Sequence, residues 1–166
     1  SKRNWKCIGS GINYNTSKFA ANALIANLRR SCAFDIFENH KHIDISAEAA
    51  ILTFVANIWR EGYQSDVLSE IEKLITHNNI PVIVTNLGDT RFDELVMKVD
   101  YGVEKETVLA LPIIRVPKVS EIYSFPLNLL LVHKIVEELK TVSVSPHVDV
   151  FSTVALREPS ALESRS

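Results

Sequence analysis

The sequence has few residues that interrupt or cross-link a chain. Among 166 residues there are five glycines, six prolines and two cysteines. These counts exclude a collagen-like or low-complexity chain, and two cysteines are too few for the disulfide framework of a small secreted domain. Cys7 and Cys32 each lie in an apolar segment, outside any Cys-x-x-Cys spacing. We therefore expect both to be buried free thiols.

An excess of one charge and long apolar runs are also missing. Eighteen Lys and Arg against twenty Asp and Glu give a net charge of -2, so no basic stripe is available to neutralise a nucleic-acid backbone. No apolar run approaches the roughly 18 residues that cross a bilayer, and the first residues do not lead into the apolar region of a signal peptide. We expect a cytoplasmic protein that binds neither nucleic acid nor a membrane.

The composition is that of one compact domain. Hydrophobic residues make up 46% of the chain and charged residues 23%, and a mass of 18.6 kDa allows a core of ordinary size. We expect a single domain over residues 1–156 and a polar tail over residues 157–166, which has no hydrophobic period. Because the chain opens at Ser1 rather than at Met, we also consider it as a piece of a longer polypeptide.

Hydrophobic periodicity predicts strands that alternate with helices. Helices are expected over Thr16–Arg30, Tyr63–Asn78 and Leu127–Lys140. The first is rich in alanine, which suits close packing or a subunit contact. Strands are expected around residues 5–8 and over residues 33–37, 50–56, 81–85 and 109–116, the last at a sheet edge because it contains Pro112. This order predicts an α/β fold, a three-layer α/β/α sandwich with a mainly parallel sheet.

Ligands of such folds bind beyond the carboxyl ends of the strands. The first loop there, Gly9-Ser10-Gly11, begins like a dinucleotide fingerprint, but Tyr14 stands where the third glycine belongs. We interpret it as a tight turn before a helix N-terminus that can meet an anion, and we expect no cofactor. Two further loops, residues 56–65 and 85–90, follow expected strands. The candidate substrate-binding residues of the three loops are Gly9, Ser10, Gly11, Asn13, Arg60 and Thr85. A lone arginine such as Arg60 is more often a surface residue, and the hydroxyls and glycine after Thr85 also describe an ordinary turn.

The densest polar cluster is Glu38-Asn39-His40-Lys41-His42-Ile43-Asp44. In an extended segment His40 and His42 point the same way, as zinc ligands do. A metal needs further ligands, which only Glu38 or Asp44 supplies, and no cysteine lies nearby, so no metal is expected. The alternatives are a histidine that shuttles a proton near neutral pH and a solvated loop.

Three stretches, taken in order, resemble the second sugar isomerase (SIS) domain of the glucosamine-6-phosphate synthases, also called glutamine–fructose-6-phosphate aminotransferases. They are the glycine turn Gly9–Tyr14 with its Ala-rich helix, the pair Lys41-His42, and the late run Pro126–His133. The resemblance implies a five-stranded parallel sheet of flavodoxin-like topology between helices. It also implies a homodimer that binds a phosphosugar or an amino sugar.

The resemblance also identifies the catalytic positions. The family uses a Lys and a Glu on the first helix, and a His from the partner subunit that opens the sugar ring. Here that His falls on His42, whereas the helix positions fall on Ala23 and Ala26. Alanine can neither form a Schiff base nor move a proton between sugar carbons. The resemblance therefore implies a phosphosugar-binding domain whose isomerase chemistry is weakened or lost.

Two other interpretations stay open. In the first, the chain is an active isomerase or aminotransferase half that works with a preceding SIS or glutaminase domain, with Glu38 as the base and His42 as the ring-opening acid. In the second, the chain is a purely structural dimerisation module that binds no ligand.

Overall fold

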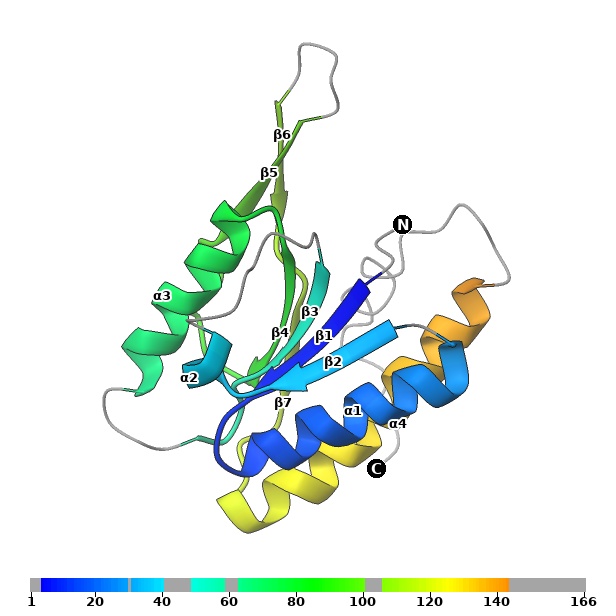
Figure 1. The fold of residues 1–166 in the computed structure, drawn as a ribbon. Helices are drawn as coiled ribbons and strands as arrows, with labels where there is room; N and C mark the ends of the chain where they lie inside the picture. The colour runs from blue at the N-terminus through cyan, green and yellow to red at the C-terminus, as the bar shows by residue number, and fades with distance from the viewer. Residues whose placement is uncertain (1–3, 30, 41–48, 59–62, 101–105, 144–166) are drawn as a thin grey trace, which may run out of the picture.

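The computed structural model describes residues 4–29, 31–40, 49–58, 63–100 and 106–143 of the chain. Figure 1 shows its helices and strands along the chain. They are β1 (Asn4–Gly9), α1 (Ile12–Leu28), β2 (Ser31–Asp35), α2 (Phe37–His40), β3 (Ala49–Phe54), α3 (Tyr63–Thr76), β4 (Ile80–Asn86), β5 (Val96–Asp100), β6 (Glu106–Ala110), β7 (Ile113–Val116) and α4 (Glu121–Ser143).

Five of the strands form one parallel sheet in the order β2-β1-β3-β4-β7. The predicted α/β fold with a five-stranded parallel sheet is confirmed. β5 and β6 form a separate antiparallel hairpin, which extends away from the sheet in Figure 1. The sequence analysis did not predict this hairpin.

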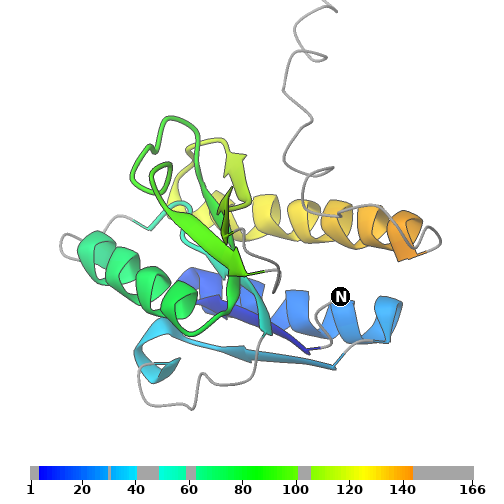
Figure 2. The ribbon, with the colours of Figure 1, turned by 90° about the horizontal axis from the view of Figure 1, so that it is seen from above.

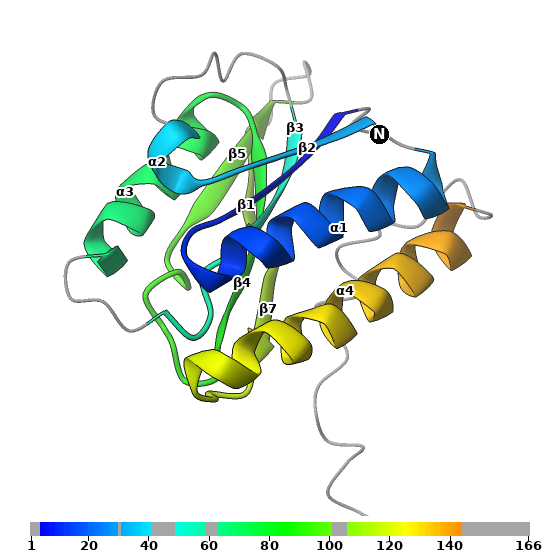
Figure 3. The same cartoon turned by 60° about the horizontal axis from the view of Figure 1, so that its bottom comes forward.

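Helices cover both faces of the sheet. α1 and α4 lie side by side on one face, as Figure 3 shows, and α2 and α3 lie on the other (Figure 2). Each face has its own apolar core. Leu24 of α1 and Val132 of α4 pack in one, whereas Ile71 of α3 and Phe92 pack in the other. In the described part of the chain, no helix is long and apolar enough to cross a membrane.

The expected strand over residues 109–116 is two strands in the structure. β6 ends at Ala110 and β7 begins at Ile113, on either side of Pro112. Proline has no N–H to donate to a strand ladder, although the Pro112 carbonyl still accepts a hydrogen bond from the Ile83 N–H at 2.9 Å. β7 is an outer strand of the sheet, as Pro112 predicted.

The last helix begins earlier than expected. α4 starts at Glu121 and contains Pro126 in its second turn. The missing N–H of Pro126 leaves the Ile122 carbonyl without its helical partner. Because Ile122 is highly exposed, water can reach that carbonyl. The proline is therefore tolerated inside the helix rather than before it.

The structure bears on two expectations about small residues. The alanines Ala20 and Ala21 of α1 are fully buried in the core of the same chain, so this part of the Ala-rich face makes the close packing that was one of its two expected roles. Cys7 is buried as expected, but Cys32 is only half-buried because β2 is the outer strand at the other edge of the sheet. Both thiols are free.

The turn from β1 into α1 depends on glycine. A Cβ on Gly9 would lie 2.5 Å from the backbone oxygen of Asn13, which is closer than atoms can approach without a shift of the backbone. Gly11, the residue before the helix, has a φ of 60°, a conformation that glycine adopts at little cost. The strand and the helix can thus approach closely at this turn.

We expect Gly9→Ala to lower the free energy of unfolding by about 3 kcal/mol, the upper end of the range for overpacking, because a backbone oxygen cannot rotate away. Urea denaturation measures the change. Gly88→Ala is the control, because its added Cβ meets nothing within 4 Å and only its positive φ costs about 1 kcal/mol. A smaller loss for Gly9→Ala than for Gly88→Ala would contradict the prediction.

Candidate functional site

The strand order of the sheet reverses between β1 and β3, the position at which open α/β sheets have their ligand crevice. The chain proceeds outward from β1 to β2 on one side and from β3 through β4 to β7 on the other. In parallel sheets, ligands bind at the carboxyl ends of the strands where the order reverses. Here the Gly9-Ser10-Gly11 turn follows β1 and the segment Val55–Asn57 follows β3. These segments form the candidate site, which we call the β1/β3 crevice.

The N-terminus of α1 lies at this crevice. Among the residues that the structure describes, no side chain caps the helix, and its first turn has no acidic residue. The N–H groups of Asn13 and Tyr14 bond back to the carbonyls of Ser10 and Gly11, at 3.2 and 3.1 Å. The start of a helix carries a partial positive charge. An anion at this position therefore meets a favourable potential.

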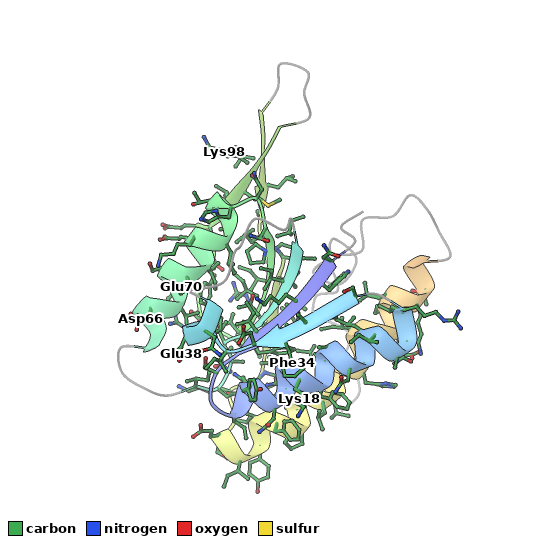
Figure 4. All side chains as sticks on the ribbon, viewed as in Figure 1. Lys18, Phe34, Glu38, Asp66, Glu70 and Lys98 are labelled. Atoms are coloured by element: carbon green, nitrogen blue, oxygen red, sulfur yellow. The ribbon has the colours of Figure 1, made fainter. Side chains whose placement is uncertain are left out.

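Ser10 and Glu38 are brought together at the same edge. The Ser10 hydroxyl accepts a hydrogen bond from the Phe37 N–H at 3.2 Å and donates one to Glu38 Oε2 at 2.7 Å. Figure 4 shows Glu38 on α2, beside the turn from β1 into α1. Ser10 is buried, whereas Glu38 is exposed. The pair thus presents a carboxylate to solvent next to the N-terminus of α1.

Asn13 links three elements below the crevice. Its Nδ2 donates to the backbone carbonyls of Phe54 and Ala56, at 3.3 and 2.9 Å. Its Oδ1 accepts a hydrogen bond from Asn128 Nδ2 of α4 at 2.9 Å. Asn13 and Asn128 are both fully buried. In this structure Asn13 positions the end of β3 against α1 and α4, and its predicted contact with substrate stays a prediction.

A second asparagine pair joins the ends of the next strands. Asn86 Oδ1 accepts a hydrogen bond from the Asn57 N–H at 2.9 Å, and Asn86 Nδ2 donates to Asn57 Oδ1 at 2.8 Å. Asn57 Oδ1 also accepts a hydrogen bond from the Val119 N–H at 2.9 Å. Asn57 has a φ of 60°, which asparagine tolerates better than most residues. The pair fixes the backbone where β3, β4 and β7 end.

Thr85 belongs to a charged network at the end of β4. Its hydroxyl donates to Asp89 Oδ2, and Arg91 holds the same carboxylate through two hydrogen bonds of 2.8 and 2.6 Å. Arg115 of β7 donates to the Asp89 carbonyl and to the Asp93 carboxylate. The hydrogen bonds from Arg91, with help from Thr85, lower the pKa of Asp89 to about 2. Thr85 is buried, and its contact with substrate remains a prediction.

The structure assembles some of the predicted site residues. Gly9, Ser10, Gly11, Asn13 and Glu38 lie together at the β1/β3 crevice, and Thr85 lies at the end of β4. Arg60 and His42 are outside the described residues, as is Asp44 of the metal alternative. In the described ranges, no group of three or more His, Cys, Asp or Glu side chains could hold a metal ion.

The positioning residues of this edge, Asn57, Asn86, Asp89 and Asn128, were not among the predicted site residues. The available signal was an asparagine directly after each of two predicted strands, at Asn57 after residues 50–56 and at Asn86 after residues 81–85. A side-chain amide there can satisfy the backbone groups that the end of a strand leaves unpaired.

The lowered pKa of Asp89 makes a prediction about pH. A carboxyl whose pKa falls from 3.8 to about 2 on folding stabilises the folded state above its ordinary pKa. This contribution is lost as the pH falls toward 2. We expect the difference in unfolding free energy between the wild type and Asp89→Asn to be largest above pH 4 and to shrink between pH 4 and pH 2. Urea denaturation at a series of pH values measures it.

Thr85→Val serves as the matched variant, since it removes one hydrogen bond to the carboxylate and leaves Arg91 in place. The folded-state pKa of Asp89 in this variant should lie above that of the wild type, so the pH-dependent stabilisation should be smaller and its loss should be complete at a higher pH. A difference between wild type and Asp89→Asn that does not change with pH would contradict the assignment.

Comparison with known proteins finds similarity in structure but not in sequence. No protein-family model and no curated protein matches the chain. Among solved structures, the chain is similar to the C-terminal domain of glucosamine-fructose-6-phosphate aminotransferase from Francisella tularensis, with a TM-score of 0.59 and 12% identity. That match covers 82% of this chain and 36% of the other.

Two further structures show the same similarity. Tagatose-6-phosphate ketose/aldose isomerase from Escherichia coli gives a TM-score of 0.53 at 14% identity, over 89% of this chain and 39% of the other. The NanR protein of Vibrio vulnificus, complexed with ManNAc-6P, gives 0.57 at 15% identity, over 92% and 52%. The chain thus spans only about a third to a half of each of these proteins. The resemblance noted in the sequence is confirmed at the level of structure, and the chain has the fold of the sugar isomerase domains.

Proposed function

We propose that this domain binds a sugar phosphate in the β1/β3 crevice and that its isomerase chemistry is weakened or lost. The observation that carries the proposal is the position of the Ser10–Glu38 pair beside the uncapped N-terminus of α1. Hydrogen-bond donors and a carboxylate acceptor thereby lie at one edge of the sheet.

The N-terminus of α1 and the Glu38 carboxylate suit the two parts of a sugar phosphate. The N-terminus of α1 favours the phosphate, which is an anion. The Glu38 carboxylate repels a phosphate but accepts hydrogen bonds from sugar hydroxyls. Gly11 is exposed and has no side chain, so that a ligand can approach its backbone closely. The contact of Gly9 with substrate stays a prediction. A phosphosugar whose phosphate lies at α1 and whose hydroxyls face Glu38 satisfies both groups. Arg60 and Thr85 remain the further candidate contacts.

The positions that correspond to the family's helix Lys and Glu support weakened chemistry. Ala23 and Ala26 occupy the last turns of α1, and Ala23 lies about 16 Å along the helix from its start. Neither residue has a titratable group, and both lie far from the Ser10–Glu38 pair. The family's helix Lys and Glu therefore have no counterpart in this chain, which leaves Glu38 as the candidate base at the carboxyl edge.

The similar structures support a phosphosugar as the ligand. One is complexed with ManNAc-6P and another is a ketose/aldose isomerase of a sugar phosphate. Because the chain spans only part of these proteins, a preceding SIS or glutaminase domain in a longer chain is part of the proposal. The proposal also includes a cytoplasmic location, a role in amino sugar metabolism and a ring-opening role for His42 across a subunit interface.

Thermal unfolding in the presence of sugar phosphates tests the binding proposal. We expect fructose 6-phosphate, glucosamine 6-phosphate or ManNAc-6P to raise the melting temperature of the chain, since a ligand that binds only the folded state stabilises it. The unphosphorylated sugars and inorganic phosphate are the controls. No shift with any sugar phosphate would favour a structural dimerisation module.

Glu38→Gln then tests the site. Loss of one hydrogen bond to a sugar hydroxyl costs about 0.5–1.5 kcal/mol, so the Kd should rise several-fold. Glu72→Gln, an exposed carboxyl on α3, should leave the Kd unchanged. Equal effects of the two substitutions would show that Glu38 acts only through net charge.

We further expect that the isolated chain does not convert fructose 6-phosphate to an aldose phosphate, because Ala23 and Ala26 replace the base and the amine. Loss of a general base alone typically costs about 10²–10⁴ in rate. A coupled assay for the aldose phosphate measures turnover. Turnover that is abolished by Glu38→Gln would overturn the expectation and would identify Glu38 as a base.

The outer faces of α1 and α4 support the proposal of a homodimer. Ile122 is 81% exposed and Leu130 71%, and with the exposed Pro126 they form a stripe at every fourth residue of α4. Phe19 and Ile25 add exposed apolar side chains on the neighbouring α1. Apolar patches of this kind mark interaction sites. A second copy can pack its own α1 and α4 against these side chains. A two-fold axis then relates the two copies, and the apolar patch of each copy is buried.

We expect sedimentation at micromolar concentration to give a species of twice 18.6 kDa. The double variant Ile122→Glu/Leu130→Glu should sediment as the monomer, because each charge would be buried at the interface. Val96→Glu/Val108→Glu, on the exposed β5–β6 hairpin, is the matched control and should remain a dimer. A monomeric wild type would refute the proposal.

A further inference from the structure

The two cysteines lie in contact on neighbouring strands. The Sγ atoms of Cys7 and Cys32 are 3.7 Å apart, although the residues are 25 positions apart in the sequence. In the register of β1 with β2, Cys7 pairs with Phe34 and Cys32 pairs with Trp5. The cysteines are therefore diagonal neighbours, and both pack into the core cluster between the sheet and the helices α1 and α4.

The two thiols differ in environment. Cys7 is fully buried, whereas Cys32 is half-buried on the outer strand β2. The hydrogen bond to Cys32, together with burial, raises the pKa of Cys7 well above its ordinary value. The same hydrogen bond lowers the pKa of Cys32. The more accessible sulfur is thus also the one that ionises first.

We propose that Cys7 and Cys32 form an oxidation site, in which a hydroperoxide converts the two thiols into an intrachain disulfide and Cys32 reacts first. The proposal rests on the contact between the sulfurs and on the accessibility of Cys32. It does not depend on the proposed sugar-phosphate function.

The chemistry balances with hydrogen peroxide as the oxidant. The Cys32 thiolate attacks one peroxide oxygen, the O–O bond breaks, and the other oxygen leaves as hydroxide, which takes up the proton that the thiol released. Cys32 is then a sulfenic acid. The Cys7 sulfur attacks the Cys32 sulfur, the S–O bond breaks, and the hydroxyl leaves as water with the Cys7 proton. Two thiols and one peroxide give one disulfide and two water molecules.

The geometry requires only a small movement. The sulfurs must approach from 3.7 Å to a bond length of about 2.05 Å, and the Cα atoms must lie within about 7 Å. Within the described residues β2 pairs with β1 alone. It can therefore shift along β1 without disturbing a third strand.

The bond would join the two strands that lead to the candidate site. β1 continues into the Gly9-Ser10-Gly11 turn and β2 continues into α2, which carries Glu38. Ser10 and Glu38 are the residues that connect these segments at the carboxyl edge. A disulfide would add a covalent link between the same two strands, from Cys7 in the carboxyl half of β1 to Cys32 near the start of β2. Oxidation should therefore raise the melting temperature.

Intact-mass analysis of the full chain tests the proposal. The folded protein is treated with hydrogen peroxide, unfolded in the presence of iodoacetamide and weighed. We expect the mass of the unmodified monomer less two hydrogen atoms, with no alkylation, and return of two alkylatable thiols after reduction. The same treatment of the chain in urea is the control, and the disulfide should form more slowly there because the sulfurs are no longer in contact.

Two variants test the order of reaction. In Cys7→Ala, Cys32 should form a sulfenic acid that dimedone traps. In Cys32→Ala, the buried Cys7 should remain alkylatable after the same peroxide treatment. Three results would overturn the proposal: sulfinic acid at Cys32 with a free Cys7 in the wild type, a disulfide between two chains, or equal rates in the folded and unfolded chain. The wild-type measurements decide the matter even if a variant does not fold.

Discussion

The amide of Asn13 is the constraint on which the β1/β3 crevice depends. One buried side chain donates to two carbonyls at the end of β3 and just beyond it, and accepts a hydrogen bond from Asn128 of α4. The same residue approaches Gly9 so closely that no side chain fits there. The N-terminus of α1 is thereby fixed relative to the ends of two strands and to the helix beside it. A buried amide that lost these partners would leave unsatisfied polar groups in the core, which is costly.

The remaining loops of this edge are held by the same kind of interaction. Asn57 and Asn86 exchange two hydrogen bonds, and Asn57 also binds the backbone before α4. Asp89 is held by Thr85 and Arg91. Side chains thus satisfy backbone groups that a parallel sheet leaves unpaired where its strands end. The described segments of this edge are thus held in place by contacts within the chain, and a ligand at the proposed site would not have to order those segments first.

The fold was largely predictable from the sequence. A continuous apolar run indicates a buried strand, and apolar residues at helical spacing indicate a helix with one buried face. The alternation of the two identified the parallel sheet, and Pro112 identified an edge strand. The β5–β6 hairpin was missed because Val96–Asp100 and Glu106–Ala110 are short, and they pair with each other outside the main sheet. The start of α4 was missed because a proline in the second turn costs little where the freed carbonyl reaches water.

For the site, the glycine turn was visible in the sequence. The asparagine pairs were not, because which partner an amide finds is decided by the packing of distant segments.

The proposed phosphate site and the positions that correspond to the family's helix Lys and Glu lie in separate regions of the chain. Ser10, Glu38 and the start of α1 lie at the carboxyl edge, whereas Ala23 and Ala26 lie near the other end of the same helix. A rigid helix keeps these two regions apart by about 16 Å, so no side-chain rotation within this chain can unite them. A phosphosugar held at the carboxyl edge could be transformed only by groups that come from outside the helix, such as Glu38 itself or a residue of a second subunit. In the proposed function, alanine at positions 23 and 26 therefore removes the groups of one region without altering the carboxyl edge, so that binding of a phosphosugar does not depend on the ability to isomerise it.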